Sequence, residues 1–232
     1  PATIELSICA MVIAIVFAIP LGYLAAKRKG STFDNGTIVL SLIGVAVPVF
    51  FLAFLMKYWF AIQTHTFPVS GRQDQALGCT RVTGFFVADG LMTREFDYSA
   101  DALRHLVLPS IVLATIPFAV IFRITRASVL EVLDEDYVRT ARAKGLSEAV
   151  VLFCHVLKNA LIPIITSAGS YLPYVFLGSL VFESFFGIPG LGAFVIEAIS
   201  GQDFAIVRAM VSVDPPGGNG TIKFTGLSGQ AA

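Results

Sequence analysis

The chain has 232 residues, of which 56% are apolar and 14% charged, with 16 basic and 16 acidic residues. Soluble domains carry about 25% charged residues, so much of the charge that usually faces water is missing. The zero net charge argues against a basic nucleic-acid-binding protein and an acidic disordered segment, and three cysteines are too few for a disulfide scaffold. The composition predicts a membrane protein.

Four apolar stretches without charged residues are candidates to cross the bilayer, which takes about 20 residues as a helix. They cover Leu6–Ala26, Thr37–Met56, Leu106–Phe122 and Ala160–Phe182. Helices are expected because every backbone polar group in a bilayer must be hydrogen-bonded without water. Each stretch contains proline, either as an ordinary component of a membrane helix or as a point of flexing. The predicted fold class is an all-α, polytopic membrane helical bundle with a helical cytoplasmic loop.

The basic residues predict the orientation, because short cytoplasmic loops are enriched in Lys and Arg. Lys27–Lys29 follow the first stretch, and six basic residues lie between the third and fourth: Arg123, Arg126, Arg139, Arg142, Lys144 and Lys158. By contrast, Gln63–Ala102 has three basic residues against five acidic ones, and Glu183–Asp203 has no basic residue. We therefore expect both basic loops in the cytoplasm, and the other two segments and Pro1 outside.

The second basic loop predicts two short helices, Ser128–Ala143 and Ser147–Ala160, around a turn. Gly145 suits the left-handed residue that follows a helix, and Ser147 suits a helix N-cap. The small residues Ala141, Ala143 and Gly145 would let another backbone come close.

Arg139, Arg142 and Lys144 form a basic collar around these small residues. The pattern fits a protein-docking surface, and it fits equally an amphipathic loop that rests on anionic lipid headgroups.

Residue patterns for catalysis, cofactor binding or metal binding are not found in the sequence. His65, His105 and His155 fall in different regions, and the cysteines lack metal-ligand spacing. No Gly-x4-Gly-Lys-Ser/Thr phosphate-binding loop is present. Because the four apolar stretches contain no charge, the sequence argues against a proton-coupled carrier. We therefore expect no catalytic, cofactor or metal site in this chain.

Several motifs resemble one family of membrane proteins. Asp136-Tyr-Val-Arg-Thr-Ala-Arg-Ala-Lys-Gly-Leu146, followed by His155–Ala160 and Pro163, is similar to the cytoplasmic signature of binding-protein-dependent ABC importer permeases. The similarity is greatest to the first permease subunit of the dipeptide/oligopeptide/nickel group. Further similar motifs occur in order along the chain: Ala2–Leu6, Gly30–Asp34, Pro48–Phe50, Pro68–Arg72, Leu108-Pro109, Thr125-Arg126, Glu131–Leu133 and Phe186–Gly192.

The chain departs from the general family signature at two places. Arg139-Thr140-Ala141 and Gly145 stand where the general motif has Glu-Ala-Ala and Gly, so that Arg replaces the acidic residue. The Leu-Pro pair that closes the motif is also absent at its usual spacing, where Leu157-Lys158 stands. At both places the sequence is similar to that of permeases in the peptide group.

In this family the signature forms a coupling helix that docks into a groove on a separate ATPase subunit. The resemblance implies that the ATPase contact comprises Asp136, Tyr137, Arg139, Thr140, Ala141, Arg142, Ala143, Lys144, Gly145 and Leu146. It also implies that ATP and Mg²⁺ bind the partner ATPase and that this chain holds no cofactor. The implied partners are ATPase subunits, a second homologous permease, a periplasmic or lipoprotein solute-binding protein and the lipid bilayer, without nucleic acid.

The implied function is that of a multi-pass permease subunit of the bacterial cytoplasmic (inner) membrane, in an ATP-driven importer of di- or oligopeptides. A nickel or glutathione importer of the same architecture is an alternative, and a secondary carrier or a non-transporting membrane scaffold would be rivals from other classes. By comparison with the family's six helices, we expect residues 1–211 to be an incomplete permease domain. Residues 212–232 are expected to form a disordered tail from outside the family, so that the chain resembles a truncated or spliced sequence.

The motif Gly187-Ile-Pro-Gly-Leu-Gly192 lies in the second segment predicted to face outward. It is interpreted as part of a re-entrant element, with Gly187, Pro189, Gly190 and Gly192 as candidates for the surface that receives a loaded binding protein. The alternative is an ordinary loop packed on the helix bundle.

Overall fold

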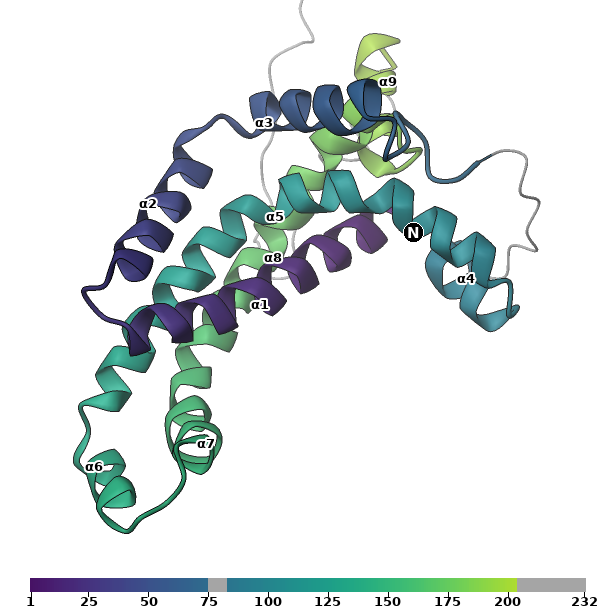
Figure 1. Cartoon of the computed structure of the whole chain (residues 1–232). Coiled ribbons are helices and arrows are strands. Elements are labelled where there is room, and N and C mark those ends of the chain that lie inside the picture. Colours follow the sequence, from purple (N-terminus) through teal and green to yellow (C-terminus); the bar gives the residue numbers. More distant parts are fainter. Residues whose placement is uncertain (75–82, 204–232) are drawn as a thin grey trace, which may run out of the picture. The chain divides into compact units, whose positions relative to one another are not determined.

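The computed structural model of the chain describes residues 1–74 and 83–203. Every regular element in these two ranges is a helix, which confirms the all-α prediction (Figure 1). The elements are α1 (Ala2–Lys27), α2 (Thr32–Ala46), α3 (Val49–Met56), η1 (Lys57–Gln63), α4 (Phe86–Met92), α5 (Phe96–Leu133), α6 (Asp136–Ala143), α7 (Glu148–Val150), η2 (Val151–Leu157), α8 (Lys158–Phe186) and α9 (Leu191–Ser200). Both η elements are π-helices.

The chain divides into one unit over Pro1–Ala193 and another from Phe194 onward. The elements from α1 to α8 lie in the first unit. The predicted tail, residues 212–232, and the preceding residues 204–211 lie outside the described residues.

Over the two described ranges, three helices are long and apolar enough to cross a membrane: α1, α5 and the continuous helix Glu148–Phe186, which comprises α7, η2 and α8. They contain the predicted spans 6–26, 106–122 and 160–182. At 38 residues α5 extends well beyond its predicted span at both ends. Prolines lie inside all three helices without ending them: Pro20, Pro109, Pro117, Pro163 and Pro173. Membrane helices tolerate proline in this way when neighbours satisfy the freed backbone groups.

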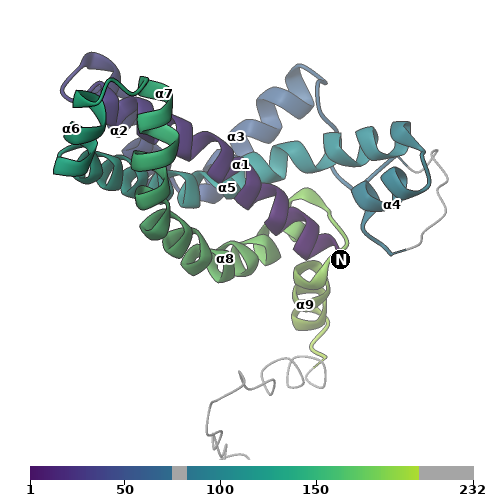
Figure 2. The same ribbon diagram turned by 90° about the horizontal axis from the view of Figure 1, so that it is seen from below.

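Helices α1 and α5 run side by side through the first unit (Figure 2). One face of α1 repeats every four residues and is buried throughout: Leu6, Ala10, Ala14, Ala18, Gly22 and Ala26. A Cβ atom added to Gly22 would lie 2.8 Å from the Cβ atom of Thr125 on α5. The small residues therefore permit the close backbone approach that is typical of helix contacts in membranes.

The second predicted span, residues 37–56, is not one continuous helix. Helix α2 ends at Ala46, and α3 with η1 continues over Val49–Gln63 after a bend of 100°. Proline disfavours the helical conformation of the residue before it, and Val47 is accordingly extended at φ −74° and ψ 126°. Pro48 thus accounts for the break. The bent pair counts as a fourth span only if it crosses the membrane as one element.

The cytoplasmic helices predicted over 128–143 and 147–160 are also corrected. Residues 128–133 belong to α5, and α6 begins only after Glu135, which is extended at φ −70° and ψ 144°. The break turns Val138 and Ala141 toward the rest of the chain, where both are buried. Residues 148–160 belong to the long helix that becomes α8, because no residue in this stretch interrupts it.

The two ends of the first unit are held by different polar contacts. At the end that carries the basic loops, the Asp34 carboxylate accepts hydrogen bonds from Arg126 Nε at 2.6 Å and Arg126 Nη2 at 2.7 Å. The backbone N–H of Gly30 donates to Asp34 Oδ2 at 2.9 Å. This cluster joins the α1–α2 loop to α5. The side chains of Asp34 and Arg126 are 1% and 23% exposed.

Replacing Asp34 by alanine should strongly destabilise the fold, because it leaves Arg126 without its carboxylate partner. We expect the D34A variant to lose about 3 kcal/mol, near the lower end for broken buried pairs because Arg126 keeps some access to solvent. Unfolding of the detergent-solubilised chain, followed by circular dichroism, measures the loss. D136A is the matched control, since its carboxylate is 99% exposed and lies 3.8 Å from Arg139. Equal effects of both substitutions would contradict the assignment.

Candidate functional site

The segment between α5 and α8 presents α6 and a tight turn. The N–H groups of Gly145 and Leu146 donate to the carbonyls of Arg142 at 2.9 Å and Ala141 at 3.4 Å, which is the usual closing pattern of a helix followed by a left-handed residue. Gly145 has φ +76°, and Ser147 Oγ accepts from the Val150 N–H at 3.5 Å. The predicted roles of Gly145 at the helix end and Ser147 as N-cap are confirmed.

The predicted ATPase-contact residues do not all lie on the surface. The exposed members are Asp136, Tyr137, Arg139, Thr140, Arg142, Ala143, Lys144, Gly145 and Leu146. Ala141 is only 5% exposed and belongs with Val138 to the main apolar core, which also includes Val151 and Val156 of η2. The small size of Ala141 is therefore explained by packing within the chain. Contact between the exposed residues and an ATPase stays a prediction.

Two polar contacts join α6 and its turn to the long helix Glu148–Phe186. Asn159 Nδ2 donates to the Tyr137 hydroxyl at 2.8 Å, and Arg142 Nε donates to Glu148 Oε1 at 3.1 Å. Arg142 is thus partly neutralised within the chain, as is Arg139, which lies 3.8 Å from Asp136. The basic collar consequently offers less free charge to anionic lipid than the sequence indicated. We call residues 134–147 the coupling segment.

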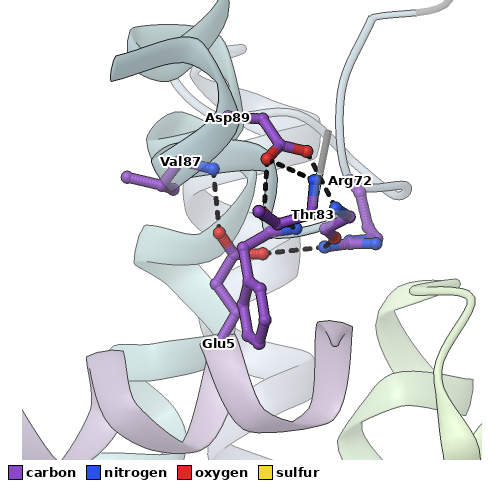
Figure 3. A network of polar contacts seen from close by, with 7 residues as sticks. Glu5, Arg72, Thr83, Val87 and Asp89 are labelled. Carbon is purple, nitrogen blue, oxygen red and sulfur yellow. Dashed lines mark hydrogen bonds and ion pairs between the residues drawn. The ribbon is translucent and has the colours of Figure 1, made fainter. Parts of the chain in front are cut away.

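At the opposite end, a polar network joins the first turn of α1 to the loop before α4 (Figure 3). Glu5 accepts from Arg72 Nη2 at 2.7 Å and from the Val87 N–H at 2.9 Å. Arg72 also donates to the Gly84 carbonyl at 3.2 Å, and its guanidinium lies 3.8 Å from the ring centre of Phe86.

Asp89 completes this network from inside α4. Its carboxylate accepts from the N–H groups of Thr83 and Gly84, both at 2.9 Å, and from the Thr83 hydroxyl. Thr83 and Gly84 are therefore fixed to α4, and Gly84 is joined through Arg72 and Glu5 to α1 (Figure 3).

Each glycine of the motif after α8 is required by the local structure, either by its backbone conformation or by a lack of space for a side chain. We call residues 183–192 the outer junction. Gly187 ends α8 at φ +62°, with its N–H donating to the Ser184 carbonyl at 3.3 Å. A Cβ atom on Gly190 would overlap the carboxyl group of Glu183, and one on Gly192 would overlap the carbonyl group of Leu180.

Pro189 follows two residues after this helix end, a common position because proline cannot continue a helix. These findings favour the alternative of a loop packed on the bundle. Whether Gly187, Pro189, Gly190 and Gly192 also receive a binding protein stays a prediction.

Several ionisable residues that hold the structure together were not singled out from the sequence. Glu5, Lys57 and Glu183 each lie one residue beyond an expected span, and all three contact backbone groups in the structure. Their position in the sequence could have identified these three residues, since a charged side chain at the end of an apolar stretch needs a partner.

Metal-binding geometry is not found in the described residues. Within residues 1–74 and 83–203, no three His, Cys, Asp or Glu side chains come together in a group that could hold a metal ion. Cys79 lies outside this part of the chain.

Enlarging Ala141 should displace α6, because the side chain has no room to grow. We expect A141L to cost about 1–3 kcal/mol through overpacking, whereas A143L on the exposed face of the same helix should have little effect. Limited proteolysis in inside-out vesicles checks this, since detachment of α6 frees the exposed residues 134–135 and 144–147 to take up the extended conformation that a protease cleaves. Equal cleavage of both variants would show that the buried face of α6 is assigned wrongly.

Comparison with known proteins adds to this geometry. The model of the family described as "Binding-protein-dependent transport system inner membrane component" matches residues 18–213. The di/tripeptide transport system permease protein DppB of Pseudomonas aeruginosa is 46% identical over 208 residues, which are 90% of this chain and 62% of that protein. The dipeptide transport system permease proteins DppB of Escherichia coli and Alkalihalophilus pseudofirmus are 40% and 39% identical, over 90% and 91% of this chain and 63% and 64% of their own lengths.

The chain therefore spans a little over three fifths of the length of these curated relatives. The family match covers well over half of the chain, and it includes the coupling segment and the outer junction described above. On this evidence, the chain belongs to the family of inner membrane components of binding-protein-dependent transport systems.

Proposed function

We propose that this chain acts in a permease subunit of an ATP-driven importer that moves di- or oligopeptides across the cytoplasmic membrane. The observation that carries the proposal is the identity of 46% to a di/tripeptide transport permease over 90% of the chain. A nickel or glutathione importer of the same architecture is the alternative within the class. The names of the relatives favour peptides as the transported solute. One of these relatives is a probable D,D-dipeptide transport system permease protein of Escherichia coli, which is 36% identical.

The coupling segment is the proposed contact with a separate ATPase subunit, which would bind ATP and Mg²⁺. Docking drives transport only if its free energy differs between the inward-open and outward-open states. The structure offers a path for that difference, because Asn159 and Glu148 join the coupling segment to a single helix of 39 residues. At about 1.5 Å per residue, such a helix is roughly 58 Å long and can carry a displacement from one membrane face to the other.

The remaining proposed partners are a second homologous permease, a periplasmic or lipoprotein solute-binding protein and the lipid bilayer. Large apolar side chains on α2, α3 and α8 are exposed, among them Leu40, Phe50 and Ile162. Such surfaces suit lipid or a neighbouring membrane subunit rather than water. A scaffold without transport would need the same surfaces, so solute uptake that depends on ATP hydrolysis by the partner is the deciding property.

Substituting Gly145 by arginine should abolish uptake while membrane insertion stays intact. Among the described residues no atom lies within 4 Å of a Cβ atom built on Gly145. Within this part of the chain, the cost of the substitution is therefore the left-handed backbone conformation, which is about 1–2 kcal/mol for a residue with a side chain. A larger effect must come from contact with a partner. We expect G145R to lose ATP-dependent dipeptide uptake and substrate-stimulated ATP hydrolysis in the reconstituted complex.

Gly30 provides a matched control for this experiment. It has φ +79°, its Cβ position is equally free of neighbouring atoms in the described part of the chain, and it lies in the other basic loop. The G30R variant therefore carries the same backbone cost outside the coupling segment and should retain uptake. Unchanged substrate-stimulated ATP hydrolysis in G145R would refute the coupling role. Equal losses in both variants would assign the effect to backbone strain.

A further inference from the structure

The outer junction is fastened to three segments that are distant in sequence. Lys57 Nζ of η1 donates to the Phe185 carbonyl at 3.1 Å and lies over the rings of Phe185 and Phe186. The Gly71 N–H donates to the Phe186 carbonyl at 3.1 Å. Thr3 of α1 accepts from the Leu191 N–H at 3.1 Å. The outer junction thereby connects α1, η1 and the loop that contains Gly71.

Glu183 lies at the centre of this junction and is completely buried. Its Oε2 atom accepts from the Gly192 N–H at 2.6 Å, across a turn in which the Ile188 N–H donates to the Glu183 backbone carbonyl at 2.8 Å. Among the described residues Oε1 has no hydrogen-bond partner. A buried carboxylate is costly unless it is paired, so a structural reason for a glutamate here is needed.

The first N–H groups of α9 provide that reason. Leu191 and Gly192 begin α9, and helix N-termini leave such donors without partners inside the helix. Thr3 and Glu183 supply the missing acceptors from two other helices. The partial positive charge at a helix N-terminus also favours a carboxylate at this position. Gly190 is required beside it because a side chain there would meet the carboxyl group.

We propose that Glu183 is a positioning residue that holds residues 190–192 against the last turns of α8. The outer end of α8 then moves together with the α1 and η1 segments that are fastened to it, so that displacement of the coupling segment reaches the outer face as one motion. This role rests on the proposed function, because it concerns how the importer transmits ATP-driven movement.

Amide hydrogen exchange tests the contact without depending on transport. In the full-length subunit in lipid nanodiscs, exchange of residues 191 and 192 should be slow in the wild type. We expect exchange of the Gly192 N–H to be about tenfold faster in E183A, since its hydrogen bond to a charged group is lost, whereas Leu191 keeps Thr3 as its acceptor. E183Q should exchange like the wild type, because its amide oxygen can still accept. S184A, which changes the exposed neighbouring side chain, is the matched control.

G190A provides an independent route to the same effect. Its added Cβ atom displaces the Glu183 carboxyl group without removing it, so exchange should again be faster. In the double variant that combines E183A with G190A, the shortened side chain at position 183 leaves room for this atom, and the combined effect should be no greater than that of E183A alone. Unchanged exchange in G190A would overturn the proposal even if E183A failed to insert, and so would simple additivity of the two effects.

Uptake by the reconstituted importer tests the positioning role. With radiolabelled dialanine and ATP, E183A and G190A should lose at least about tenfold in rate, while E183Q and S184A keep the wild-type rate. Basal ATP hydrolysis should persist in all variants. Faster exchange in E183A with wild-type uptake would overturn the positioning role. Absence of ATP-dependent uptake in the wild type itself would overturn the proposed function, and the exchange data would still decide whether Glu183 holds the junction.

Discussion

The close contact between α1 and α5 is the constraint on which the rest of the structure depends. Lipid tails are as apolar as leucine, so hydrophobicity gives helices in a bilayer little reason to associate, and close packing must supply the attraction. The four-residue repeat of small side chains on α1, which brings Gly22 beside Thr125, allows that packing. Polar contacts then join other segments to this pair of helices, through Asp34 and Arg126 at one end and Glu5 and Arg72 at the other.

The sequence predicted the helical class and three of the spans because both follow from uninterrupted apolar length. It did not predict the bend at Pro48, because proline by itself does not tell where a membrane helix breaks. The prolines at 20, 109, 117, 163 and 173 stand inside continuous helices. The difference depends on whether neighbouring elements support the backbone, and Pro48 is the position where residue 47 becomes extended. The end of α5 at Leu133 was missed for a related reason, because it follows from the packing of Val138 and Ala141 in the core.

The candidate site was predictable where local backbone chemistry decides, as at Gly145 and Ser147. It was not predictable where a residue's partner lies far away in the chain. Ala141 was expected on a docking surface because small residues suit both an interface and a core, and a single sequence does not distinguish them. The partners of Glu5, Lys57 and Glu183 come from segments between 9 and 128 residues away.

The bend between α2 and α3 has a consequence for the surrounding lipid. Each arm has 15 residues, and at about 1.5 Å per residue it reaches roughly 22 Å, which is less than the ~30 Å hydrocarbon thickness of a typical bilayer. Helix α1, with 26 residues, exceeds that thickness. One subunit thus combines a segment that is too short for the bilayer with one that is long enough to tilt in it. Local thinning of the bilayer, or a neighbouring protein, has to accommodate the bent arms, and acyl-chain length therefore acts on this part of the molecule more strongly than on α1.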